Sequence, residues 1–123
     1  MAKANARRRE IADIYRAGLA GLPGLILPQE KKGFHHVFHQ FAVRVLNGKR
    51  DALLGHLSSR GIGCAVHYPV PIHQQPAYRN VPLTVPLTVT EEINPQLLSL
   101  PMFPELTAEE QTCVISVIRD FYR

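Results

Sequence analysis

Near the start of the chain, apolar residues recur at three- and four-residue steps. The stripe consists of Ile11, Ile14, Tyr15, Leu19 and Leu22. The opposite side carries Arg8, Arg9, Glu10, Asp13 and Arg16. One apolar stripe backed by a charged face predicts an amphipathic helix over residues 4–22. Gly21 and Pro23 are expected to end this helix, because proline lacks the backbone donor and glycine tolerates positive φ.

Strict alternation over residues 37–46 predicts the main strand. One face of this strand holds Val37, His39, Phe41, Val43 and Val45. His39 therefore shares the apolar face, and we interpret it as a hydrogen-bonded core or pocket-edge histidine rather than a metal ligand. A short strand is predicted at residues 25–27, and Asn47-Gly48 should end the main strand.

Two further helices carry end signals of their own. Residues 51–60 place Leu53, Leu54 and Leu57 on one side, and Gly61 followed by Ile62 has the spacing of a Schellman ending. At the C-terminus, Thr107 and Glu110 have capping-box spacing. They precede a stripe of Val114, Val117, Ile118 and Phe121.

The middle of the chain is rich in proline. Residues 64–68 predict a second strand, and the prolines that follow predict a loop over residues 69–76. The tetrapeptide Val-Pro-Leu-Thr occurs at 81–84 and again at 85–88, which we interpret as a lengthened linker. Asn94 before Pro95 is expected to cap a short helical turn through Leu98.

These elements predict one small α+β domain with two terminal helices and a middle helix around a few strands. The 123 residues, 46% apolar and 20% charged, suit a single globular core. No apolar stretch is long enough to cross a membrane. The net charge of +4 comes largely from Arg7, Arg8 and Arg9, which we interpret as a solvated face, so no nucleic-acid partner is expected. Cys64 and Cys113 are expected to be free thiols in a reducing cytoplasm.

The densest polar segment is 67–76, His-Tyr-Pro-Val-Pro-Ile-His-Gln-Gln-Pro. Imidazole, phenol and amide groups held between prolines suit sugar hydroxyls or phosphate oxygens. The alternative is a proline-rich connector whose polar groups face water. Cys64, His67 and His73 give three possible zinc ligands where structural sites normally have four, so no metal site is predicted. No catalytic residue is predicted either, because Cys64 and His67 would point to opposite faces of a strand.

The order of several sequence blocks resembles the C-terminal region of the DegT/DnrJ/StrS-type sugar aminotransferases. These blocks are residues 5–12 with Tyr15, 39–45, 50–53, 61–62, 67–73 (HYPVPIH), 75–78, 90–92 and 98–107 (LSLPMFPELT). Together they extend over essentially the whole chain.

This resemblance implies an aspartate-aminotransferase-like, homodimeric enzyme whose N-terminal domain carries pyridoxal phosphate. Residues 1–123 would be its small C-terminal domain, with a few-stranded, mostly antiparallel sheet, three main helices and no cofactor-binding domain. By position in the family, the resemblance makes His67 and Tyr68 the first substrate-binding candidates and His73 and Gln74 the second.

The resemblance also implies transfer of an amino group from an amino-acid donor, such as glutamate, to a keto-sugar on a nucleotide diphosphate. The only lysines are Lys3, Lys31, Lys32 and Lys49, in a tail, a turn and a junction. None stands in the family's lysine context, so we expect the chain alone to be inactive and to bind no cofactor. The alternative hypothesis is a stand-alone, non-catalytic sugar-nucleotide-binding domain.

Overall fold

The computed structural model describes all residues, 1–123. Its centre is a three-stranded antiparallel sheet in the order β1 (Leu25–Ile26), β2 (Phe41–Val45) and β3 (Leu97–Leu100). In β2, Phe41, Val43 and Val45 are buried while the two residues between them are partly exposed. The predicted alternation is therefore confirmed for this part of the segment, and it places one face of the strand in the core.

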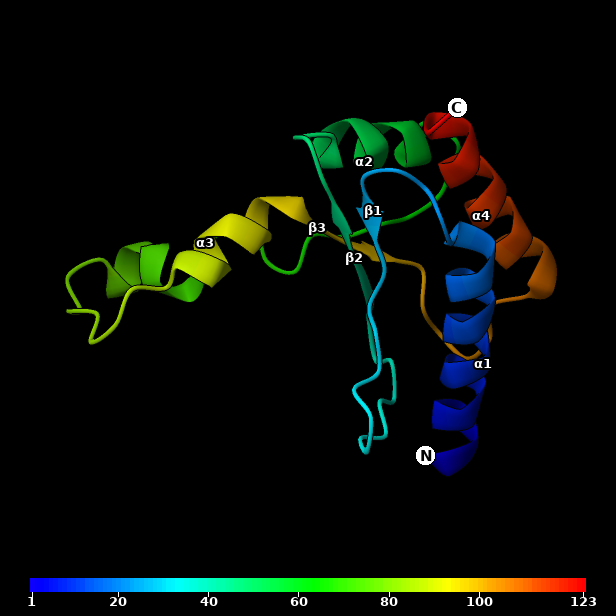
Figure 1. Cartoon of the computed structure of the whole chain (residues 1–123), viewed down its shortest axis with the longest axis horizontal. Helices are drawn as coiled ribbons and strands as arrows, with labels where there is room; N and C mark the ends of the chain where they lie inside the picture. The colour runs from blue at the N-terminus through cyan, green and yellow to red at the C-terminus, as the bar shows by residue number, and fades with distance from the viewer.

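Two long helices lie side by side on one side of the molecule (Figure 1). They are α1 (Ala2–Leu19) and α4 (Ala108–Phe121), and both run in the same direction. Gly18 allows the close approach, since a Cβ there would come within 2.7 Å of Ile115 Cδ1. The two helices are also tied by polar contacts: Gln111 Nε2 donates to the Ile11 carbonyl at 2.7 Å, and Arg119 Nη1 donates to the Gly18 carbonyl at 2.8 Å.

The predicted helix ends are confirmed where local rules decide them. In α4, the Thr107 hydroxyl accepts from the Glu110 backbone N–H, and the Glu110 carboxylate accepts from the Thr107 backbone N–H. After α2 (Arg50–Ser58), Ile62 N–H donates to the Leu57 carbonyl, and Gly61 has φ of 74°. This is the Schellman ending.

One hydrophobic core joins the helices to the sheet, with Tyr15, Phe38, Phe41, Leu53, Leu57 and Leu98 among its fully buried members. Two residues of the predicted apolar faces lie outside this core, because Ile14 is 44% and Val37 is 38% exposed. The alternation fails before Phe41, since Phe38 adopts φ of 47° and turns its ring into the core in place of Val37 and His39.

Three predictions for the middle of the chain need correction. Leu97–Leu100 is a strand paired with β2 and not the end of a helical turn. Residues 64–68 form no strand and contribute one isolated bridge, between Ala65 and Ser99. The predicted linker over residues 81–88 does not extend to its last residue, because α3 (Thr88–Ile93) begins at Thr88.

Residues 69–96, here called the arm, project from the sheet (Figure 1). The arm contains α3 and the 3₁₀ turns Ile72–Gln74, Pro76–Tyr78 and Asn94–Gln96, and none of these elements has a buried residue. Its root is held by Arg44 Nε, which donates to Gln96 Oε1 at 3.0 Å, and by Asn94 Nδ2, which donates to the Pro69 carbonyl at 3.1 Å.

With four helices and a three-stranded antiparallel sheet, the predicted α+β class is confirmed. None of the four helices is both long and apolar enough to cross a lipid bilayer.

Candidate functional site

A hollow of about 330 Å³ lies beside β3, and we call it the His67 hollow. It is lined by His39, Gln40, Gly63, Cys64, Ala65, His67, Ser99, Leu100 and Met102. No aspartate, glutamate, lysine or arginine side chain lines it. Its polar groups are imidazole, amide and hydroxyl, which both donate and accept hydrogen bonds.

Backbone pairing between Ala65 and Ser99 builds this hollow. Ala65 N–H donates to the Ser99 carbonyl at 3.2 Å, and Ser99 N–H donates back to the Ala65 carbonyl at 2.8 Å. Two residues further along, Nδ1 of His67 lies 3.0 Å from the Ser99 hydroxyl oxygen. Ser99 is buried in the sheet, so its hydroxyl is a fixed partner for the imidazole.

Tyr68 stands next to His67 in an edge-to-face arrangement, with ring centroids 5.6 Å apart. The Tyr68 side chain is 69% exposed, so its phenol is free to contact a ligand beyond the hollow. His67 and Tyr68 thus present an imidazole and a phenol at one edge of the sheet.

The other two predicted site residues, His73 and Gln74, lie in the arm. His73 Nε2 is 3.0 Å from Glu91 Oε1, and Gln74 Nε2 donates to the same oxygen at 3.4 Å. The His73 side chain is only 10% exposed. The structure therefore brings the four candidates together as two pairs, one at the hollow and one against Glu91.

Cys64 and His67 line the same hollow, although the sequence pattern predicted opposite faces. The prediction assumed a continuous strand, and the single bridge at Ala65 does not impose strand alternation. Burial raises the pKa of the Cys64 thiol to about 11, so the sulfur is protonated near neutral pH and is a poor nucleophile. His73 lies with Glu91, and no group of three metal-ligating side chains is found in the structure.

The model of the DegT/DnrJ/EryC1/StrS aminotransferase family matches residues 1–119. The chain belongs to this family. The polar edge at His67 and Tyr68 is thus a feature of a DegT/DnrJ/EryC1/StrS-family domain.

Two curated relatives of this domain carry nucleotide-sugar names. One is the dTDP-3-amino-3,4,6-trideoxy-alpha-D-glucose transaminase of Streptomyces venezuelae, 42% identical over 118 residues, which are 95% of this chain and 31% of the relative. The other is the UDP-N-acetyl-3-dehydro-alpha-D-glucosamine 3-aminotransferase of Acidithiobacillus ferrooxidans, 41% identical over 97% of this chain and 31% of the relative. The chain spans about a third of the length of the relatives it matches.

The fold agrees with that of solved members of the family. The structure of S. venezuelae DesV in complex with a ketimine intermediate superposes with a TM-score of 0.90 at 40% identity, covering 98% of this chain and 32% of DesV. The predicted aspartate-aminotransferase-like domain is therefore confirmed as to fold.

The family depends on pyridoxal phosphate, whose chemistry requires a lysine to hold the cofactor. The chain has four lysines: Lys3, Lys31, Lys32 and Lys49. All four are exposed, and none lines the His67 hollow. The lysines of this chain are therefore not placed to hold the cofactor at the His67 hollow.

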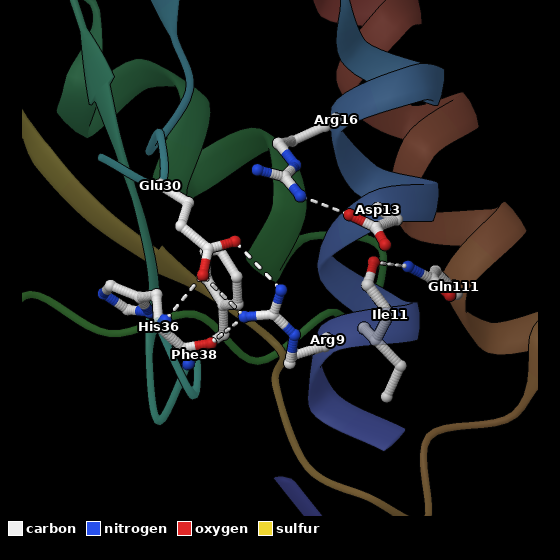
Figure 2. Close-up of polar contacts among 8 residues, drawn as sticks. All are labelled: Arg9, Ile11, Asp13, Arg16, Glu30, His36, Phe38 and Gln111. Carbon is white, nitrogen blue, oxygen red and sulfur yellow. Dashed lines mark hydrogen bonds and ion pairs between the residues drawn. The ribbon is translucent and has the colours of Figure 1, made fainter. Parts of the chain in front are cut away.

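Sequence reasoning missed two features. Ser99 was not singled out because a serine in an apolar run has no distinctive spacing, although it lies in the LSLPMFPELT block. The interpretation of Arg7–Arg9 as a solvated face is wrong for Arg9, whose guanidinium binds Glu30 with both Nη atoms (Figure 2). Arg7 also has a backbone partner, the Leu106 carbonyl at 3.1 Å.

Proposed function

We propose that the chain is the C-terminal domain of a pyridoxal-phosphate-dependent aminotransferase that acts on nucleotide-linked keto-sugars. The amino group would come from an amino-acid donor, with glutamate as the first choice. The observation that carries the proposal is the family match over residues 1–119, together with two relatives named for dTDP- and UDP-sugars. The family resemblance leads us to expect a homodimer, and the two free cysteines lead us to expect the cytoplasm.

In this proposal, the His67 hollow and Tyr68 contact the nucleotide-sugar. Sugar hydroxyls both donate and accept, and so do the imidazole of His67 and the phenol of Tyr68. The hollow carries no carboxylate that would repel a diphosphate. His73 and Gln74 would act from the arm, where Glu91 orients both side chains. The cofactor and its lysine would lie in the part of the longer relatives that this chain does not match.

The test is a graft onto the S. venezuelae transaminase. Its segment that matches this chain is replaced by residues 1–123, and the purified graft is loaded with pyridoxal phosphate. It is then assayed with dTDP-3-amino-3,4,6-trideoxy-α-D-glucose as substrate. We expect cofactor-dependent transamination, because the two segments are 42% identical over nearly the whole chain.

Point variants of the graft then test the site. His67→Ala and Tyr68→Phe should raise KM for the nucleotide-sugar by roughly tenfold, the effect of losing one or two hydrogen bonds to a bound ligand. Ser116→Ala, on the exposed face of α4, is the matched control and should leave KM unchanged. A folded, cofactor-loaded graft without transaminase activity would contradict the proposal.

The stand-alone binding hypothesis has its own measurement. Calorimetry with the isolated chain and dTDP-glucose should detect no saturable binding if the hollow is only half of a site. Saturable binding that is lost in His67→Ala would favour the non-catalytic binding domain instead.

A further inference from the structure

An ion pair joins the first helix to the connection between β1 and β2. Arg9 Nη1 lies 2.8 Å from Glu30 Oε1, and Arg9 Nη2 lies 2.9 Å from Glu30 Oε2. The two side chains are only 28% and 19% exposed. Two parallel bonds between a planar guanidinium and a carboxylate fix orientation as well as distance.

The same pair holds the backbone of a third residue, His36. Its N–H donates to Glu30 Oε1 at 2.8 Å, and its carbonyl accepts from Arg9 Nη1 at 2.6 Å (Figure 2). Both main-chain groups of His36 are therefore anchored to α1 through one salt bridge. We call Arg9, Glu30 and His36 the clamp.

His36 in turn contacts Phe38 through both its side chain and its ring face. The Phe38 N–H donates to His36 Nδ1 at 2.9 Å, and the two rings lie 4.3 Å apart. Phe38 is fully buried, its ring lies 6.2 Å from that of Phe41, and the Arg16 guanidinium stands 5.3 Å from its centroid. Its φ of 47° is a conformation that a bulky residue adopts only when its surroundings hold it there.

The two residues after Phe38 are His39 and Gln40, which line the His67 hollow immediately before β2 begins. Both are exposed and form no side-chain hydrogen bond in the structure, so their positions depend on the backbone that precedes them. We propose that Arg9 and Glu30 are positioning residues, which through His36 and Phe38 set His39 and Gln40 at the rim of the substrate hollow. The substrate part of this inference rests on the proposed function.

An ordinary ion pair on the protein surface would behave differently. Such a pair adds little to stability and does not order a neighbouring segment. The clamp instead bridges two elements and holds main-chain groups in a connection that otherwise has few internal restraints. Its loss should free residues 31–40 locally while β2 and β3 stay paired.

The first experiment measures amide hydrogen exchange on the full chain without any ligand. Arg9→Lys keeps the positive charge but loses the bidentate contact with Glu30. Arg7→Lys is the matched control on the same helix. In Arg9→Lys, exchange at His36 and Phe38 should rise by about tenfold or more, with β2 amides unchanged. Unchanged exchange at His36 and Phe38 would overturn the proposal.

The second experiment measures kinetics in the graft with the same two variants. Arg9→Lys should raise KM for the nucleotide-sugar several-fold with kcat nearly constant, and Arg7→Lys should change neither. If His67→Ala raises KM but Arg9→Lys does not, the positioning role is refuted while the proposed function stands. If His67→Ala and Tyr68→Phe leave KM unchanged, the proposed substrate contact at the His67 hollow fails, and the exchange data alone then decide whether Arg9 and Glu30 order the segment.

Discussion

Nδ1 of His67 and Oγ of Ser99 lie 3.0 Å apart, which joins an exposed imidazole to a buried strand residue. The contact occupies one ring nitrogen and leaves Nε2 free for a ligand. The hydroxyl can donate to a bare Nδ1 or accept from a protonated one, so this nitrogen is satisfied in either neutral tautomer. Ser99 therefore sets the direction of the His67 ring.

Removing the Ser99 hydroxyl tests this relationship. Ser99→Ala should lower the free energy of unfolding by about 1 kcal/mol, because one hydrogen bond is lost at a buried position. The ¹⁵N shift of Nδ1 in the His67 ring should move toward that of an imidazole in water, because Nδ1 loses its fixed hydrogen-bond partner. Ser116→Ala, on an exposed helix face, should leave both quantities unchanged. Identical His67 shifts in Ser99→Ala and the native chain would contradict the orienting role.

The two cysteines are expected to react at very different rates. Burial raises the pKa of Cys64 to about 11, so about one thiol in a thousand is ionised at pH 8. Cys113 lies exposed on α4. Iodoacetamide at pH 8 should therefore alkylate Cys113 first, as mass spectrometry of the peptides would show. Rapid loss of the single remaining thiol in Cys113→Ser would contradict the buried environment of Cys64.

How well the sequence predicts the fold depends on how far apart along the chain the interacting residues are. The capping box of Thr107 with Glu110 and the Schellman ending at Gly61 involve residues within one or two turns, and both are confirmed. β3 was missed because its last three residues are all buried and show no alternation. The Asn-Pro pair before it is also typical of a helix start. Only its pairing with β2, distant in sequence, makes the segment a strand.

The candidate site shows the same limit. The dense polar pattern indicated the segment 67–76, and the family resemblance selected His67 and Tyr68 within it, which the structure places together at one edge of the sheet. Arg9 was missed because a run of arginines is usually solvated, and its partner is 21 residues away in a connection without regular structure. Such a contact becomes visible only when α1 and the β1–β2 connection are placed in space.

Two glycines of α2 and its ending should respond in opposite ways to alanine. A Cβ would meet no atom within 4 Å at either Gly55 or Gly61, so crowding does not distinguish them. Gly55→Ala should raise the free energy of unfolding by about 0.5–1 kcal/mol, because alanine loses less entropy in a helix. Gly61→Ala should lower it by about 1 kcal/mol, because φ of 74° strains a residue with a Cβ. Urea unfolding measures both, and equal signs would contradict the Schellman ending.

The clamp should also make stability depend on pH in the acid range. The Arg9 guanidinium, with a smaller contribution from the His36 N–H, lowers the pKa of Glu30 from 4.5 to about 2. A carboxylate whose pKa is lower in the folded state stabilises the fold above pH 4.5, and this stabilisation is lost as the pH falls toward 2.

The difference in urea midpoint between the native chain and Glu30→Gln should accordingly be largest at pH 7. It should shrink by roughly half or more at pH 3, because glutamine resembles the protonated carboxyl group. Glu10→Gln is the matched control: its carboxylate is 62% exposed and pairs only with Arg7, so its effect should be small at both pH values. A difference for Glu30→Gln that is the same at pH 3 and pH 7 would mean that the Arg9 contact does not favour the ionised carboxylate in the folded chain.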